Sequence, residues 1–420
     1  MVVEEKRLKI NRLPSSSKLN GIMLKYFLKA KLADWFPWKD LAWGTAGFPM
    51  ELLWTYDLYA LHPENAACVS GVKGLSLEMI EHAESLGFSR DLCSYFKTNI
   101  GAMDKGLGVF SGGVDKPLVA CSTNTICDTH VKWFQVQARR MGVPYFGFDI
   151  PSYVAGLNDH RIDEYTEYVV EQVYDFIDLM EKLTGKEFPE KRFWKILERS
   201  DRLCEIWQEI YEYRKLVPTQ MAFQDTLAAI FPMVILPGLK SGIKYYESLL
   251  EDIKERVKEG KASMPEGTEK YRVIFEGIPF WYRIKFFHEL SNYGAVVTYE
   301  PYTYSFGPRK KLGLPLKKTF RELAKMIIDI PYNYNLQRRI DYFENVIDDY
   351  NIDGVILHSN MSCRPSATNM VDLKKAIQRD KGVPVMLLNA DMDDPRAYSE
   401  EQVRTRMEGF VELMDQNKYS

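Results

Sequence analysis

The sequence predicts an α/β protein built from two Rossmann-like parallel-sheet halves, an N-terminal helical segment and a helical connector. Short apolar runs at residues 117–121 and 143–150 have the length and composition of strands that are covered on both faces. A helix-like segment at residues 129–141 separates them, so the two strands should pair in parallel. A similar alternation returns after residue 270. At 420 residues the chain has room for two or three domains.

Charge and composition exclude several classes of protein. The chain has 55 Lys and Arg against 58 Asp and Glu, a net charge of -3, and this balance gives no positive excess for nucleic-acid binding. The first residues carry no apolar signal core, and no uncharged run approaches the ~18 residues needed to cross a bilayer. We therefore expect a cytoplasmic protein without nucleic-acid or membrane partners.

The predicted N-terminal helical segment covers residues 1–42. Lys and apolar residues mix at positions 23–32 and are followed by an aromatic-rich stretch at 35–38, which is typical of helices that pack on another layer. The first α/β domain, residues 43–160, opens with a Gly-rich turn that enters a helix. Pro49 is predicted at the first helical position and Glu51 in the first turn.

The next part of this domain carries glycines that could belong to a nucleotide site. Residues 73–86 have helical spacing, and Gly87 suits a left-handed C-terminal cap. The Gly-rich stretch 100–115 could bend close to a ligand. It lacks both common phosphate-binding patterns, because Leu107 stands where a P-loop needs Lys and Ser111 where a dinucleotide fingerprint needs Gly. We expect this chain to bind no nucleotide.

The helical connector is predicted at residues 161–265. Apolar positions between 161 and 183 repeat at three and four residues, and Gly185 ends this helix. Further helices are predicted at 190–213, 223–233 and 241–259. A polar stretch at 258–270 marks the boundary to the second α/β domain, residues 266–420. Strands of that domain are predicted at 271–276, 295–300, 354–358 and 383–389, with helices at 281–290 and 321–328.

Three of the six cysteines lie at turns beside small polar residues. Cys127 and Cys363 each follow a predicted strand by a few residues, and Cys93 opens the segment before the Gly-rich stretch. Ligands of open parallel sheets bind outside the carboxyl ends of the strands, so cysteines from both halves can face one cleft. A free cysteine is more commonly a buried small hydrophobe, however. That alternative is expected for Cys68, Cys121 and Cys204.

Four separated stretches together resemble one family of enzymes. Residues 91–95, 124–128, 358–365 and 391–398 are similar to the 2-hydroxyacyl-CoA dehydratase and benzoyl-CoA reductase family, and the similarity runs from about Trp43 to the C-terminus. The resemblance implies the larger, catalytic-type subunit of a heterodimer with a homologous second subunit. It implies a 4Fe-4S cluster held by Cys93, Cys127 and Cys363, with one open iron. It also implies a separate ATP-hydrolysing iron-sulfur activator and an acyl-CoA substrate.

The reaction that the resemblance implies is radical dehydration of an (R)-2-hydroxyacyl-CoA. One added electron gives a ketyl radical anion that expels the α-hydroxyl, and a base then removes the acidified β hydrogen to leave a 2-enoyl-CoA. One alternative is a benzoyl-CoA reductase-type subunit that reduces an aromatic acyl-CoA. Others are a non-catalytic electron-relay or structural subunit of the same complex, and an α/β binding protein with buried thiols and no metal.

Two further residues are candidates for catalysis by the same resemblance. Glu51 matches the family's Pro-x-Glu and is the candidate acid or base, although a Glu in the first turn also simply favours a helix N-terminus. Thr45 could hydrogen-bond the substrate or an iron-bound oxygen, or satisfy local backbone groups. The chain departs from many relatives at Met361 and Arg364, where those relatives carry a basic residue and Lys, so the family roles of these two positions do not carry over.

Overall fold

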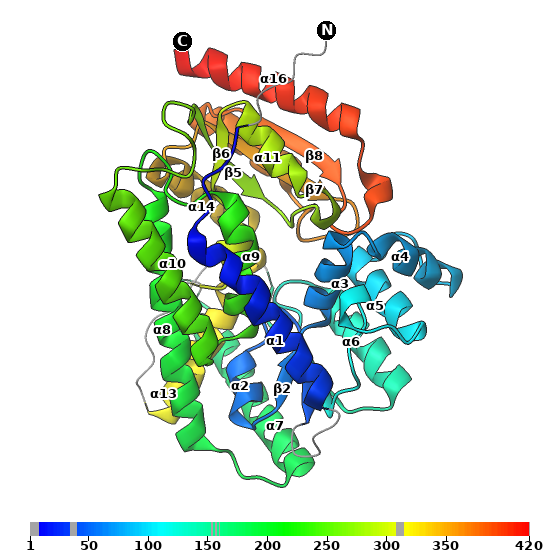
Figure 1. Cartoon of the computed structure of the whole chain (residues 1–420). Helices are drawn as coiled ribbons and strands as arrows, with labels where there is room; N and C mark the ends of the chain where they lie inside the picture. The colour runs from blue at the N-terminus through cyan, green and yellow to red at the C-terminus, as the bar shows by residue number, and fades with distance from the viewer. Residues whose placement is uncertain are drawn as a thin grey trace.

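The computed structural model describes residues 8–33, 40–152, 154–155, 158, 160–307 and 315–419. It contains two four-stranded sheets whose strands are all parallel, each flanked by helices, which confirms the predicted fold class. Figure 1 shows the C-terminal sheet at the top of the view, the first half below it and the long connector helices along one side. The aromatic stretch 35–38 lies outside the described residues.

The first sheet has the strand order β2-β1-β3-β4. Its strands are β1 (Leu41–Gly44), β2 (Tyr59–Leu61), β3 (Val119–Thr123) and β4 (Tyr145–Phe148). The two later strands confirm the prediction. The predicted Gly-rich turn is confirmed at residues 45–48, but it begins later than predicted, because Trp43 and Gly44 form the end of β1 and pair with β3. Four- and three-residue strands carry too little periodicity to be seen in a sequence.

The second sheet repeats this topology with the order β6-β5-β7-β8. Its strands are β5 (Tyr271–Glu276), β6 (Ala295–Tyr299), β7 (Gly354–Asn360) and β8 (Val385–Ala390). All four lie where the sequence predicts them. In each sheet the chain runs outward from the first strand to one edge and returns to continue on its other side. The order therefore reverses between β1 and β3 and between β5 and β7, which is where sheets of this kind bind ligands.

Helices cover both sheets and the space between them. In the first half they are α1 (Lys18–Ala33), α2 (Met50–Thr55), α3 (Pro63–Val72), α4 (Ser76–Ser85), α5 (Ser94–Asp104) and α6 (Asp128–Met141). The connector contains α7 (Ile162–Thr184), α8 (Glu190–Arg214), α9 (Phe223–Ile235) and α10 (Lys240–Lys258). The second half contains α11 (Lys285–Asn292), α12 (Pro301–Tyr304), α13 (Leu316–Ile328), α14 (Leu336–Asp349), α15 (Met370–Lys381) and α16 (Glu400–Tyr419).

Two local details differ from the sequence prediction. Pro49 is the N-cap of α2 rather than its first helical residue. The helix predicted at 73–86 begins only at Ser76, because the chain first makes a turn between α3 and α4. The predicted stop at Gly185 is confirmed, since this residue caps α7 with a φ of 67° that glycine adopts without strain.

Helix α9 is the most buried part of the connector. It contacts α10, α12 and β6, and it also contacts α1 from the N-terminal segment. A helix that is covered on several sides must be apolar over most of its surface, and α9 is. The described helices include none that is long and apolar enough to cross a membrane.

Candidate active site

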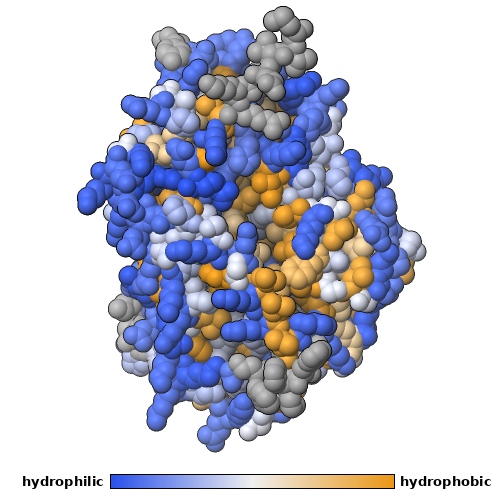
Figure 2. Space-filling view, in the orientation of Figure 1, coloured by the Kyte–Doolittle hydropathy of each residue, from blue (hydrophilic) through white to orange (hydrophobic). Residues whose placement is uncertain are grey.

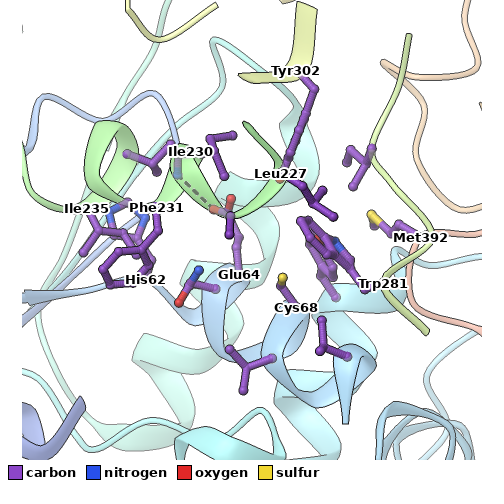
Figure 3. Close-up of a pocket in the computed structure, with 18 of the residues that line it drawn as sticks. His62, Glu64, Cys68, Leu227, Ile230, Phe231, Ile235, Trp281, Tyr302 and Met392 are labelled. Carbon is purple, nitrogen blue, oxygen red and sulfur yellow. Dashed lines mark hydrogen bonds between the residues drawn. The ribbon is translucent and has the colours of Figure 1, made fainter. Parts of the chain in front are cut away.

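A cavity of ≈ 410 Å³ lies where the two halves, α1 and α9 meet. Four cysteines contribute to its lining: Cys68, Cys93, Cys127 and Cys363. Figure 3 shows Glu64 and Cys68 pointing into this space, with Ile230 and Phe231 of α9 on one side and Trp281 on the other. The structure thus brings together the three cysteines that the sequence singles out.

Two of the three predicted cysteines are N-caps of helices. Cys93 precedes α5 and Cys127 precedes α6. The exposed backbone N–H groups and the dipole at a helix N-terminus favour negative charge, so both positions suit a thiolate. Burial raises the pKa of the Cys93 thiol, and the nearby Cys363 and Cys127 add to this, while a hydrogen bond from the backbone of Phe96 opposes it.

Cys363 occupies in the second half the place that Cys127 occupies in the first. Each follows the third strand of its sheet order, β7 or β3. The Sγ of Cys363 lies 3.5 Å from the hydroxyl of Ser366. Burial, and then the charge of Cys127, raise the pKa of Cys363 to about 12. The charges of Cys127 and Cys363 reach the thiol of Cys93, and the charge of Cys127 reaches that of Cys363, so the three thiols are close neighbours. They can ionise together only if positive charge joins them.

These three thiols have the chemistry of iron-sulfur ligands. In a 4Fe-4S cluster each thiolate binds a different iron. A donor set made only of cysteines, two of them at helix N-termini, has the right chemistry for such a cluster.

The remaining cysteines differ from one another. Cys121 and Cys204 are buried in the core, which confirms the sequence prediction for them. Cys68 of α3 is partly exposed and faces the cavity, so the prediction of a buried thiol was wrong for it. Burial raises its pKa, followed by the charge of Asp393, and none of the other three thiols contributes to that shift.

Glu64 and His130 form an ionisable pair in the cavity wall, which the sequence interpretation left without a function. The Oε1 of Glu64 accepts a hydrogen bond of 3.0 Å from the N–H of Ala46, shown as a dashed line in Figure 3, and lies 3.3 Å from Nε2 of His130. Burial lowers the pKa of His130, but the charges of Cys127 and Glu64 outweigh it and raise this pKa to about 9.

Sequence comparisons identify the family of this chain. A family model described as "2-hydroxyglutaryl-CoA dehydratase, D-component" matches residues 45–414. The chain belongs to this family. This match confirms the family resemblance of residues 91–95, 124–128, 358–365 and 391–398.

Curated members of the dehydratase family are similar over nearly the full chain. The alpha subunit of (R)-phenyllactyl-CoA dehydratase of Clostridium sporogenes is 29% identical over 383 residues, which cover 90% of both chains. The alpha subunit of (R)-2-hydroxyisocaproyl-CoA dehydratase of Clostridioides difficile is 28% identical over 416 residues, covering 96% of this chain and 98% of the relative. One of the subunits of benzoyl-CoA reductase of Thauera aromatica is 29% identical over 382 residues, with 88% and 87% covered.

The two predicted catalytic residues of this dehydratase-family chain lie just outside the cysteine cavity. Thr45 is fully buried, and its hydroxyl accepts a hydrogen bond of 3.2 Å from the N–H of Thr123, so it fastens β3 to the turn after β1. Glu51 is buried on α2 and lines a separate cavity of ≈ 110 Å³ together with Thr125. Ala46, the residue that follows Thr45, does line the cysteine cavity.

Proposed function

We propose that this chain is the iron-sulfur subunit of an ATP-activated (R)-2-hydroxyacyl-CoA dehydratase, which eliminates water to give a 2-enoyl-CoA through a ketyl radical anion. The observation that carries the proposal is the meeting of Cys93, Cys127 and Cys363 at one apolar cavity. These thiols come from both halves of the chain. Only the folded protein can therefore assemble them.

The three thiols are the proposed ligands of a 4Fe-4S cluster. When bound, such a cluster with one open iron supplies a low-potential electron and a Lewis-acidic position for a substrate oxygen. The apolar walls keep bulk water away from the reduced thioester, because protonation by water would end the radical reaction.

Glu64 is the residue best placed to move the proton of this reaction. After reduction, the substrate is a ketyl radical anion that loses hydroxide from its α carbon, and the β hydrogen of the resulting radical becomes acidic. A carboxylate facing the cavity can accept this proton. Return of the electron completes the net loss of water. Glu51, proposed from sequence for the same task, faces the neighbouring cavity, so the two acids are rival candidates.

The proposed partners are a homologous second subunit and a separate ATP-hydrolysing activator. Relatives that cover nearly the whole chain are named as alpha subunits, which supports a partner chain. The sequence carries neither common phosphate-binding loop, which supports a separate source of ATP hydrolysis.

Two alternatives lead to different products. The similarity to the Thauera benzoyl-CoA reductase chain supports reduction of an aromatic acyl-CoA as the second candidate. A third is a non-catalytic subunit that relays electrons or braces the complex.

The deciding experiment is an anaerobic assay of the purified complex with activator and ATP, preceded by iron and sulfide analysis. Formation of a 2-enoyl-CoA is expected. Ring reduction instead would favour the second candidate, and an iron-free protein would overturn the proposal.

A further inference from the structure

We propose that the cysteine cavity selects a bulky, uncharged, apolar acyl group, and that helix α9 forms the selecting wall. The inference rests on the proposed function, because it takes the ligand to be an acyl-CoA. It names the class of acyl group, which neither the family nor the three cysteines determine.

The wall formed by α9 follows directly from helical spacing. Leu227, Ile230, Phe231 and Val234 all line the cavity and are separated by three and four residues, so they occupy one face of the helix. Figure 3 shows Leu227, Ile230 and Phe231 around the same space as Glu64 and Cys68. This face carries no hydrogen-bonding side chain, so a ligand group that lies against it must be apolar.

Helices α1 and α3 present faces of the same spacing. Met23, Leu24 and Phe27 of α1 line the cavity, as do Val69 and Val72 of α3. Leu24 and Val72 are 48% and 50% exposed, which places them at an open mouth. Figure 2 shows hydrophobic residues gathered around a hollow near the middle of this face of the molecule. The α3 face also carries Glu64, so the continuous apolar walls are those of α9 and α1. A cavity of ≈ 410 Å³ is larger than a one-carbon side chain could fill.

Charged acyl groups have no suitable partner in the cavity. Among its described lining residues, the sole Asp or Glu is Glu64, and the sole Lys or Arg is Lys73. The ammonium of Lys73 lies 4.1 Å from the ring centroid of Phe110, and Lys73 is exposed. The imidazole of His130 also lines the cavity, but it lies 3.3 Å from the Glu64 carboxylate and is already paired with it. A second carboxylate inside the cavity would therefore meet the negative charge of Glu64 and find no unoccupied cation among these lining residues, and an unpaired buried carboxylate is strongly disfavoured.

The polar part of an acyl-CoA has a better match on the other side of Cys127. There a second cavity of ≈ 290 Å³ shares Ile126 and Cys127 with the first. Its polar lining includes Asn124, Ser152, Arg364, Thr368 and Asn369. The pantetheine arm of coenzyme A carries two amides, which need such partners, whereas an apolar acyl chain needs none. With the pantetheine arm in the polar cavity, the acyl chain would occupy the apolar one.

The test is binding of thioesters that lack the α-hydroxyl and cannot be dehydrated. Calorimetry on the anaerobically purified complex, without ATP, compares 3-phenylpropionyl-CoA and 4-methylpentanoyl-CoA with propionyl-CoA and glutaryl-CoA. The first two are expected to bind about tenfold or more tighter than the last two. Equal affinities, absence of binding, or tighter binding of glutaryl-CoA would overturn the inference. Tight binding of the apolar pair without dehydration of their 2-hydroxy counterparts, in the presence of activator and ATP, would support the inference while removing the proposed function.

A pair of variants on α9 locates the selecting wall. Ala228 lines the cavity, so Ala228→Leu should narrow it and lower the affinity for the two bulky thioesters about tenfold, with that for propionyl-CoA unchanged. Met233 faces the smaller cavity near Glu51, and Met233→Leu is the control expected to leave all four affinities unchanged. A uniform loss in Ala228→Leu, or the same loss in the control, would contradict selection by this wall.

Discussion

The backbone N–H of Ser94 donates a hydrogen bond of 3.1 Å to the hydroxyl of Ser362. These residues adjoin Cys93 and Cys363, so one hydrogen bond joins the turns that carry two of the three thiols. The Ser362 hydroxyl in turn donates to the carboxylate of Asp391, which accepts the backbone N–H of Asp393 at 2.9 Å. The distance between two proposed ligands is therefore set by a polar network that spans the two halves.

Ser362→Ala should loosen this arrangement. The change leaves the Ser94 N–H and one Asp391 oxygen without their partner, and each unpaired buried group costs about 1–3 kcal/mol. We expect a lower free energy of unfolding in urea and less iron retained after gel filtration. Ser85→Ala is the control, because Ser85 is exposed and its hydroxyl donates to the carbonyl of His82 in the same turn. Equal iron content in both variants would contradict a positioning function for Ser362.

Substitution of the cavity cysteines should divide them into two groups. Cys93→Ala, Cys127→Ala and Cys363→Ala should each lose most of the iron of the anaerobically purified protein, because a cluster with two remaining thiolates is poorly held. Cys68→Ala should keep it, although Cys68 lines the same cavity. Iron and sulfide analysis with electron paramagnetic resonance measures the outcome. Loss of iron from the Cys68 variant would show that Cys68 is a fourth ligand. The proposed cluster would then have no open iron.

The two rival acids can be separated by the same substitution. Glu64→Gln keeps the shape of the side chain and the hydrogen bond from Ala46 but cannot accept the β proton, so turnover should fall about 10²–10⁴-fold with the iron content unchanged. Glu51→Gln should alter turnover far less, since Glu51 faces a different cavity. A larger loss of turnover in Glu51→Gln than in Glu64→Gln would indicate that Glu51 is the base.

Much of the fold could be predicted because the strands of the second half are apolar runs with clear boundaries. The short strands β1 and β2 could not, since three or four residues do not establish a period. The positions of Cys127 and Cys363 followed from the rule for parallel sheets. The orientation of Glu64 and Cys68 did not, because the face that α3 turns to the cavity depends on packing with distant helices.

The buried ion pair between Arg214 and Glu300 should be sensitive to removal of one partner. Both side chains are fully buried, and both guanidinium–carboxylate contacts measure 2.8 Å. Arg214→Met leaves the Glu300 charge unpaired at the junction of α8 with the second half, so the free energy of unfolding should fall by about 3–5 kcal/mol. Arg202→Met on the same helix is the control, because Arg202 is 49% exposed and its change should cost at most about 1 kcal/mol. Similar losses in urea unfolding for both variants would contradict this account.

Stability should decrease in acid through Glu84, which joins α4 to the C-terminal half. Its carboxylate lies 2.7 Å from Arg396 and 2.9 Å from Lys97. The hydrogen bond from Arg396 chiefly, helped by Lys97 and opposed by burial, lowers the pKa of Glu84 from 4.5 to about 2. Because the folded pKa lies below the unfolded one, the stabilisation is complete above the unfolded pKa and is lost as the pH falls toward 2.

Glu84→Gln should therefore lower the free energy of unfolding by roughly 1–2 kcal/mol at pH 7, allowing for partial solvent screening. The difference from the unchanged protein should shrink steadily below pH 5. Glu78→Gln is the matched control on α4, since its carboxylate is 64% exposed and pairs with Lys105, which also belongs to the first half. Urea unfolding at pH 7 and pH 3.5 measures both variants. A difference for Glu84→Gln that stays constant between these two pH values would show that its carboxylate is not stabilised as the Arg396 and Lys97 contacts require.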